Sequence, residues 1–264
     1  MKARLLVSAI GIPLLLGIVF CTPPWCMTVC LAVLSMIAAY ELLHAVGGGQ
    51  WKHAALAIVL AGGNTLCFSG AWLSSADAGV PLFLTVVLCF ALAVAGYGTK
   101  RAISYPALMA MLFAAAAIPA SFSCLARLRC TSPLLALTPF VAAFCSDSLA
   151  LFAGMLFGKH KLAPHTSPKK TVEGSIGGVL GAVLGMVLLR LLTSLKLDWS
   201  VVLALGVLGS VMGQLGDLSF SFIKREFSVK DYGNLMPGHG GVLDRFDSVL
   251  FVAPAFWLYL SIVF

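Results

Sequence analysis

Residues 221–247 read SFIKREFSVKDYGNLMPGHGGVLDRFD and form a charged, glycine-rich stretch. This stretch holds four of the ten acidic residues of the chain and four of its seventeen lysines and arginines. The segments on either side of it are overwhelmingly apolar. Such an island is either a solvated loop or a place where chemistry occurs, and the composition of the rest of the chain indicates which fold surrounds it.

The composition is that of a membrane protein. Hydrophobic residues make up 60% of the 264 residues and charged residues 10%, and the mean hydropathy is +1.02. Soluble domains are nearer half apolar and a quarter charged. We therefore expect an all-α, polytopic integral membrane protein with a single membrane domain, 1–264. Within it, 1–130 would supply the N-terminal spans and 131–264 the spans that carry the polar motifs.

The hydropathy pattern predicts about nine transmembrane helices. The first is an uncleaved helix, because no small-x-small cleavage site follows it and further spans come after it. The expected spans are Leu5–Cys21, Trp25–Val46, Ala54–Trp72, Val80–Tyr97, Ile103–Leu125, Pro133–Phe157, Val172–Leu195, Trp199–Ile223 and Val242–Phe264.

The distribution of basic residues predicts the orientation. With the N-terminus inside, thirteen lysines and arginines fall on inside segments and four on outside ends. This asymmetry favours an N-in, C-out topology, with the polar loops 158–171 and 224–241 both facing the cytoplasm. The same bias accounts for the net charge of +7, so we do not expect a nucleic-acid partner.

The eighth expected span carries a polar stripe. The positions fall on one face of a helix: Gln214, Asp217, Ser221, Lys224 and Arg225. A carboxylate in the centre of a span costs roughly 2.5–3.5 kcal/mol on insertion scales, so the stripe should face protein rather than lipid. Asp217 either pairs with a lysine or arginine to hold helices together or belongs to a ligand or metal site.

The start of the last expected span adds two more carboxylates. Asp244 and Asp247 are three residues apart on one helical face, with Arg245 between them. If this helix packs beside the eighth, these two converge with Asp217, and a divalent cation would relieve their repulsion. Oxygen ligands without His or Cys predict Mg²⁺, and a second cation is compatible with this many carboxylates. The alternative is that Asp244 and Asp247 favour the helix N-terminus electrostatically.

The loop that joins these spans has the chemistry of a phosphate site. Lys230 supplies charge, and Gly240 and Gly241 let backbone N–H groups approach a ligand closely. His239 has either a direct chemical role or a structural one. The alternative for the whole loop is a solvated connection.

The other polar loop precedes the seventh expected span. We expect Ser167 and Pro168 to form the N-cap and first position of that helix, with Lys169 and Lys170 beside its free amides. This arrangement suits a polyphosphate, and the alternative is an ordinary positive-inside loop. Within the span, a ridge of small residues favours close packing inside one chain over a homodimer seam: Gly177, Gly181 and Gly185.

These motifs together resemble those of the phosphatidate cytidylyltransferases, also called CDP-diacylglycerol synthases. The C-terminal signature reads Ser221-x-x-Lys224-Arg225-x4-Lys230-Asp231-x-Gly233-x3-Pro237-x-His239-Gly240-Gly241-x-x-Asp244-Arg245-x-Asp247. Two upstream motifs agree with it, Ser167-Pro168-Lys169-Lys170-Thr171-x-Glu173-Gly174 and Gln214-x-Gly216-Asp217. The ordered match spans about 147–247. Met236, Ser148 and Val172 depart from the usual residues without removing a charge.

The resemblance implies a multi-pass enzyme of the bacterial inner membrane, in phospholipid biosynthesis, with its active site facing the cytoplasm. It would join CTP and phosphatidic acid to give CDP-diacylglycerol and pyrophosphate, with Mg²⁺. The expected catalytic residues are Asp217, Lys224, Arg225, His239, Asp244 and Arg245. The expected metal ligands are Asp217, Asp244 and Asp247. The expected substrate and phosphate contacts are Ser167, Lys169, Lys170, Thr171, Ser221, Lys230, Gly240 and Gly241.

Two other readings remain open at this point. One is a related membrane transferase or kinase that acts on another phospholipid or on a polyprenyl lipid. The other is a cation-coupled transporter, for which the acidic residues Glu41 and Asp147 within expected spans are the reason.

Overall fold

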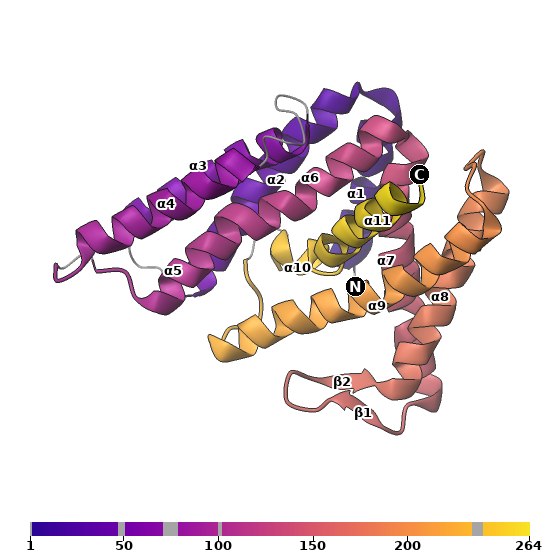
Figure 1. Ribbon diagram of the computed structural model, residues 1–264. Helices are drawn as coiled ribbons and strands as arrows, with labels where there is room; N and C mark the ends of the chain where they lie inside the picture. Colours follow the sequence, from indigo (N-terminus) through magenta and orange to yellow (C-terminus); the bar gives the residue numbers. More distant parts are fainter. Residues whose placement is uncertain (1, 47–50, 71–78, 100–101, 234–239) are drawn as a thin grey trace. The chain divides into compact units, whose positions relative to one another are not determined.

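A computed structural model of the chain describes all residues except 1, 47–50, 71–78, 100–101 and 234–239 (Figure 1). The chain forms two compact units. One comprises Met1–Cys130 and Phe227–Arg245, and the other comprises Thr131–Glu226 and Phe246–Phe264. The single membrane domain expected for 1–264 stays a prediction.

The first unit is helical. Its elements are α1 (Lys2–Cys21), α2 (Pro24–Ala45), α3 (Trp51–Phe68), α4 (Gly79–Gly96), α5 (Tyr105–Leu112), the π-helical turn η2 (Phe113–Ala117) and α6 (Ile118–Thr131). Proline begins α2, where its missing N–H is not needed. Ser104 caps α5, because its side chain accepts a hydrogen bond from Ala107 N.

A buried polar cluster supports the π-helical turn of this unit. The Asn64 Nδ2 donates to Ala115 O at 2.5 Å and to Thr85 Oγ1 at 2.8 Å. Both side chains are buried. The wider turn of a π-helix disturbs the regular backbone bonds, and Asn64 provides a partner for one of its carbonyls.

The second unit contains α7 (Pro133–Phe157), β1 (Lys161–Ala163), β2 (Ser167–Thr171), α8 (Val172–Leu192), α9 (Trp199–Glu226) and α11 (Val249–Val263). The short α10 (Leu243–Phe246) precedes α11. β1 and β2 pair antiparallel, with Lys161 opposite Thr171. Figure 1 shows this hairpin at one end of α7 and α8, beside the helices that it connects.

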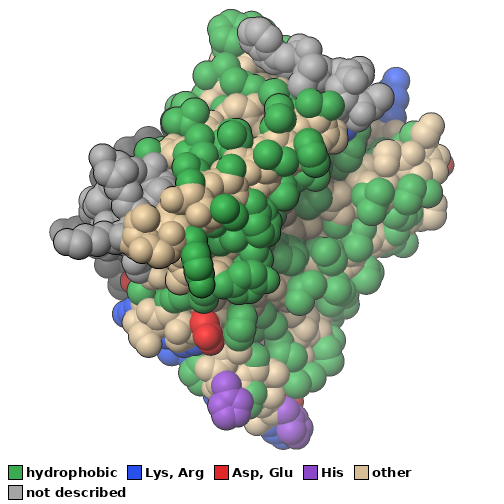
Figure 2. Space-filling model, turned by 60° about the vertical axis from the view of Figure 1, so that its left-hand side comes forward, with side chains coloured by type: hydrophobic (Ala, Val, Ile, Leu, Met, Phe, Trp, Pro, Cys, Tyr) green, Lys and Arg blue, Asp and Glu red, His purple; other side chains and the backbone are tan. Residues whose placement is uncertain are grey.

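Glycines set the close packing of α8 on α7. A Cβ atom on Gly177 would lie 2.3 Å from Ala153 Cβ, and one on Gly181 would lie 2.5 Å from Cys145 O. The glycine ridge therefore packs within the chain, as the sequence favoured. On another face, α8 exposes leucines at four-residue spacing, namely Leu180, Leu184 and Leu188. Figure 2 shows hydrophobic side chains over much of the visible face, which suits contact with lipid.

The protein is a multi-pass membrane protein. Among the described residues, six helices are long and apolar enough to cross a membrane: Pro24–Ala45, Gly79–Gly96, Tyr105–Thr131, Pro133–Phe157, Val172–Leu192 and Trp199–Glu226. Ala54–Phe68 and Val249–Val263 are shorter apolar helices. Nine crossings and the N-in, C-out orientation stay predictions.

Two local predictions were wrong. Ser167 and Pro168 do not begin a helix, because they lie in β2. Thr171 is the N-cap of α8, where its Oγ1 accepts from Gly174 N at 3.1 Å. The last helix is also not continuous from Val242, since a turn at Asp247 and Ser248 separates α10 from α11. There the Asp247 side chain accepts from Ser248 N at 2.7 Å, a local bond that competes with helix.

Candidate active site

A cavity of about 460 Å³ lies in the second unit. Its lining comes from α7, the hairpin, the first turn of α8 and the polar face of α9, and includes Asp147, Gly154, Leu162, Lys169, Lys170, Thr171, Ser175, Gln214 and Asp217. Its size falls within the range of small-molecule sites. Three expected phosphate contacts and one expected metal ligand thus line one cavity.

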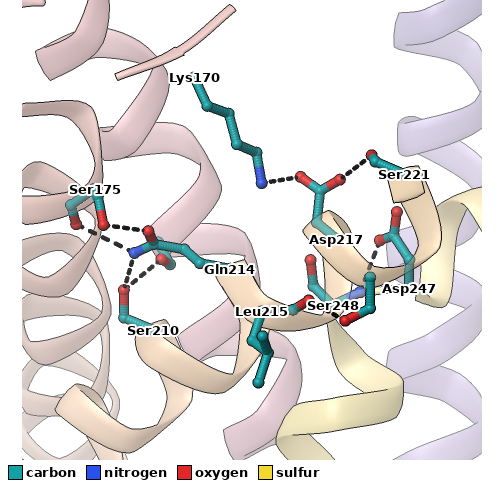
Figure 3. Close-up of polar contacts among 11 residues, drawn as sticks. Lys170, Ser175, Ser210, Gln214, Leu215, Asp217, Ser221, Asp247 and Ser248 are labelled. Atoms are coloured by element: carbon teal, nitrogen blue, oxygen red, sulfur yellow. Dashed lines mark hydrogen bonds and ion pairs between the residues drawn. The ribbon is translucent and has the colours of Figure 1, made fainter. Parts of the chain in front are cut away.

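Asp217 is the central charged group of this cavity. The Lys170 Nζ lies 2.5 Å from Asp217 Oδ2, and both side chains are about a quarter exposed, at 25% and 28%. The Ser221 hydroxyl, one turn further along α9, donates to Asp217 Oδ1 at 3.2 Å. Figure 3 shows these contacts on the two sides of the carboxylate. Each oxygen of Asp217 therefore has a partner that residues of the motifs supply.

Gln214 ties together the helices beneath Asp217. Its Nε2 donates to Ser210 Oγ at 2.8 Å and to Ser175 O at 3.1 Å, and its Oε1 accepts from the Ser175 hydroxyl. Ser210 in turn shares a hydrogen bond of 2.8 Å with Ser146. This network links α7, α8 and α9 one helical turn from Asp217 (Figure 3). The serines were not predicted as part of a site, and isolated small polar residues in apolar spans were their only signal.

Asp247 brings a second carboxylate near Asp217. A Cβ atom on Gly216 would lie 2.6 Å from Asp247 O, so the turn before α11 rests directly on α9. The rings of Phe220 and Phe251 meet edge to face, with centroids 6.3 Å apart, and hold these helices together. The negative charges of Asp217 and Asp247 lie close enough to act on one another. A cation between the two carboxylates would relieve this repulsion.

Other contacts fix the hairpin that carries Lys169 and Lys170. The Glu173 carboxylate accepts from the backbone N–H of Lys159 at 3.1 Å and of His160 at 3.3 Å. Its Oε1 also lies 2.6 Å from His160 Nδ1. From α9, Arg225 Nε donates to Thr166 O at 3.3 Å. The hairpin is therefore held at its base and near its turn.

The remaining expected site residues belong mostly to the first unit. There the Asp244 Oδ2 accepts from Tyr232 N at 2.8 Å and from Gly241 N at 3.0 Å. Gly240 has a φ of +80°, which glycine adopts without strain. Lys230 and Arg245 are exposed in this unit, whereas Ser167 and Lys224 are half-buried in the second. His239 lies outside the described residues.

Carboxylates of the second unit could supply oxygen donors to a metal. Asp217 and Asp247 supply oxygen ligands, and the charge of Asp147 also acts on Asp247. Among the described residues, no group of three or more His, Cys, Asp or Glu side chains is arranged to hold a metal ion. The three-carboxylate site of Asp217, Asp244 and Asp247 stays a prediction.

Comparison with known proteins assigns the family. A model of the cytidylyltransferase family matches residues 2–263. The chain belongs to this family. The resemblance that the motifs indicated is thereby confirmed, and the match extends through the N-terminal spans, where the sequence offered only hydrophobicity.

Several bacterial relatives carry the name phosphatidate cytidylyltransferase. The one from Bacillus subtilis (strain 168) is 46% identical over 122 residues, which cover 46% of this chain and 45% of the relative. The one from Staphylococcus haemolyticus (strain JCSC1435) is 43% identical over 115 residues, 44% of each chain. The chain therefore spans less than half the length of the curated relatives that it matches.

Proposed function

We propose that this cytidylyltransferase joins CTP and phosphatidic acid, giving CDP-diacylglycerol and pyrophosphate for phospholipid biosynthesis. The observation that carries the proposal is the cavity in which Lys169, Lys170 and Thr171 meet Asp217 at the ends of apolar helices. A lipid phosphate and a water-soluble nucleotide must meet at the membrane surface. The names of the bacterial relatives support the same reaction.

Lysines of β2 are the proposed phosphate ligands. An ammonium group has three donors, so Lys170 can contact a phosphate oxygen while it remains beside Asp217. Lys169 and the Thr171 hydroxyl line the same cavity. Lys224, Arg225, Lys230 and Arg245 stay predicted as supporting phosphate contacts.

Asp217 and Asp247 are the proposed holders of Mg²⁺. Mg²⁺ is bound by one or two carboxylates together with waters and substrate phosphates, and a pair of aspartates fits that donor set. When bound, the ion would neutralise charge on the phosphates of CTP. Asp244 is proposed as a further ligand, and a second cation stays compatible with the acidic residues around the site.

The proposed reaction needs little proton transfer from the protein. An ionised phosphate oxygen of phosphatidic acid attacks the α-phosphorus of CTP, and the bond from that phosphorus to the bridging oxygen of the β-phosphate breaks. Phosphatidic acid already carries this negative oxygen at neutral pH, so no strong general base is required. Positioning by the cavity and neutralisation of charge by Lys169 and Lys170 would supply most of the catalysis.

The two alternative functions, a transporter and an enzyme for another lipid, would use the residues of this cavity differently. A transporter would use Asp147 in an ion path, but Asp147 lines the cavity that also contains Lys170 and Asp217, which favours one shared phosphate site. A transferase or kinase for another lipid would keep the phosphate contacts and change only the acceptor. The proposed location is the bacterial inner membrane, with the cavity open to the cytoplasm.

The test is an assay of purified protein with labelled CTP and a panel of lipids. We expect CDP-diacylglycerol from phosphatidic acid and no comparable product from a polyprenyl phosphate or from diacylglycerol. Lys170→Met should lower the rate strongly. If only another lipid gives labelled product, that lipid and not phosphatidic acid is the acceptor.

A further inference from the structure

Glu41 of α2 is a buried carboxylate that the proposed reaction does not use. Only 3% of the surface of Glu41 is exposed. Its Oε1 accepts from Val242 N at 2.9 Å, and its Oε2 accepts from Leu243 N at 2.8 Å. Each oxygen thus holds one amide at the start of α10, about 200 residues further along the chain.

Glu41 also contacts both arms of the loop that leads into α10. A Cβ atom on Gly233 would lie 2.6 Å from Glu41 Oε1, and one on Gly241 would lie 2.3 Å from Oε2. We call the described residues of these arms, 232–233 and 240–243, the loop neck. Side chains larger than glycine at these two positions would displace the carboxylate. The two glycines therefore leave the space that the Glu41 side chain occupies.

A second carboxylate ties the same two arms. Asp244 Oδ2 accepts from Tyr232 N on one arm and from Gly241 N on the other. The neck is therefore closed from within by Asp244 and held against α2 by Glu41. Asp244 is both a part of this closure and an expected member of the active site.

We propose that Glu41 is a positioning residue for the reaction, holding the loop neck so that Asp244 and Arg245 keep one orientation. The proposal rests on the proposed function. A helix of four residues cannot maintain its own geometry, and its first N–H groups have no partner within the helix. Buried donors require acceptors, and charged acceptors bond roughly twice as strongly as neutral ones. The orientation of α10 therefore depends on Glu41.

The test compares Glu41→Gln with a control on the same helix. The amide side chain keeps the shape but replaces one acceptor by an NH₂ group, so one neck amide loses its partner. The control is Ser35→Ala, which removes a buried hydroxyl of α2 that donates to Ala61 O at 3.4 Å. The measurements are hydrogen exchange of peptides covering 240–246, and kcat and KM for CTP.

For Glu41→Gln we expect exchange of the neck amides to be roughly tenfold faster and kcat to be roughly tenfold lower, the effect of losing one buried charge-assisted bond. KM for CTP should change less than kcat, because the substitution leaves the proposed main phosphate ligands, Lys169 and Lys170, in place. Ser35→Ala should leave the exchange and kcat near wild type. Glu41→Asp retains the charge and both acceptors, so it should keep more of kcat than Glu41→Gln.

Several results would overturn the proposal. If the neck amides exchange as slowly in Glu41→Gln as in wild type, Glu41 does not hold the loop neck. If they exchange faster but kcat is unchanged, Glu41 is not a positioning residue for the reaction. An equal fall of kcat in Ser35→Ala would assign the effect to general packing of α2. If Glu41→Gln does not fold, Glu41→Asp with wild-type exchange and reduced kcat would equally contradict the idea. If the wild-type protein forms no product, the proposed function is overturned instead. The exchange rates of the neck amides would still test whether Glu41 holds the loop neck.

Discussion

Replacing Asp217 by asparagine tests whether the role of this carboxylate is catalytic or structural. The substitution keeps the shape of the side chain, and its oxygen can still accept from Ser221, which lies at 3.2 Å in the wild type. What is lost is the ion pair with Lys170 at 2.5 Å. Hydrogen bonds to charged groups contribute about 1.5–3 kcal/mol, and partial exposure reduces this toward ~1 kcal/mol. The variant should therefore fold and insert, with only a small loss of stability.

The expected loss of activity is far larger. If Asp217 holds the cation that neutralises the phosphates, its removal should lower kcat by roughly 10³-fold, or about 4 kcal/mol in the barrier. The assay is formation of CDP-diacylglycerol by purified protein in lipid, with thermal unfolding measured on the same samples. A barrier increase several times the stability loss is the signature of a catalytic role.

The double variant Asp217→Asn with Lys170→Met is the matched control. It removes both charges of the pair, so no unpaired charge is left and stability should return toward wild type. Activity should not return, because the carboxylate is still missing. An Asp217→Asn enzyme that keeps metal-dependent activity within tenfold of wild type would show that Asp217 is not a catalytic residue. Recovery of activity in the double variant would show that Asp217 serves only to balance Lys170.

Three further outcomes follow from the same structure. Chelation of divalent cations with EDTA should abolish product formation and added Mg²⁺ should restore it, whereas activity that persists in EDTA would contradict the metal assignment. Glu173→Gln should loosen the hairpin at His160 and raise KM for CTP several-fold, with little change in thermal stability. An unchanged KM would show that the contacts of Glu173 with the hairpin are not needed for CTP binding. Gly181→Ala should lower stability by about 1–3 kcal/mol, because the new methyl group would lie 2.5 Å from Cys145 O. Gly63→Ala, with no atom within 4 Å of the added Cβ, is its control in thermal unfolding.

Helical periodicity accounts for what the sequence could foresee about the second unit. Gln214, Asp217 and Ser221 were expected on one face of a span, and the structure gives them hydrogen bonds along the polar face of α9. The glycines of α8 were expected to permit close packing, and Gly181 meets α7. These inferences succeeded because each depends on residues a few positions apart on one helix. Their catalytic and ligand roles stay predictions.

Local competition between structures explains the errors. Ser167-Pro168 has the composition of a helix start, but Thr171 offers an equally good cap, and pairing of β1 with β2 decides between them. At the start of α11, the side chain of Asp247 bonds the next backbone N–H, which interrupts a helix that hydropathy alone would continue.

Long-range contacts were beyond the sequence. Nothing near Glu41 indicates that it binds the amides of Val242 and Leu243. Ser175 likewise lies in a glycine-rich segment that reads as packing, and its bond with Gln214 depends on how α8 and α9 meet. Such pairs come from distant parts of the chain, where neither spacing nor periodicity gives information.

The proposed function is tested by conversion of labelled CTP and phosphatidic acid by the purified, folded protein in lipid, with and without Mg²⁺. We expect CDP-diacylglycerol and an equal amount of pyrophosphate, only when Mg²⁺ is present. Folded protein that yields neither product with phosphatidic acid and Mg²⁺ would rule out phosphatidate cytidylyltransferase activity.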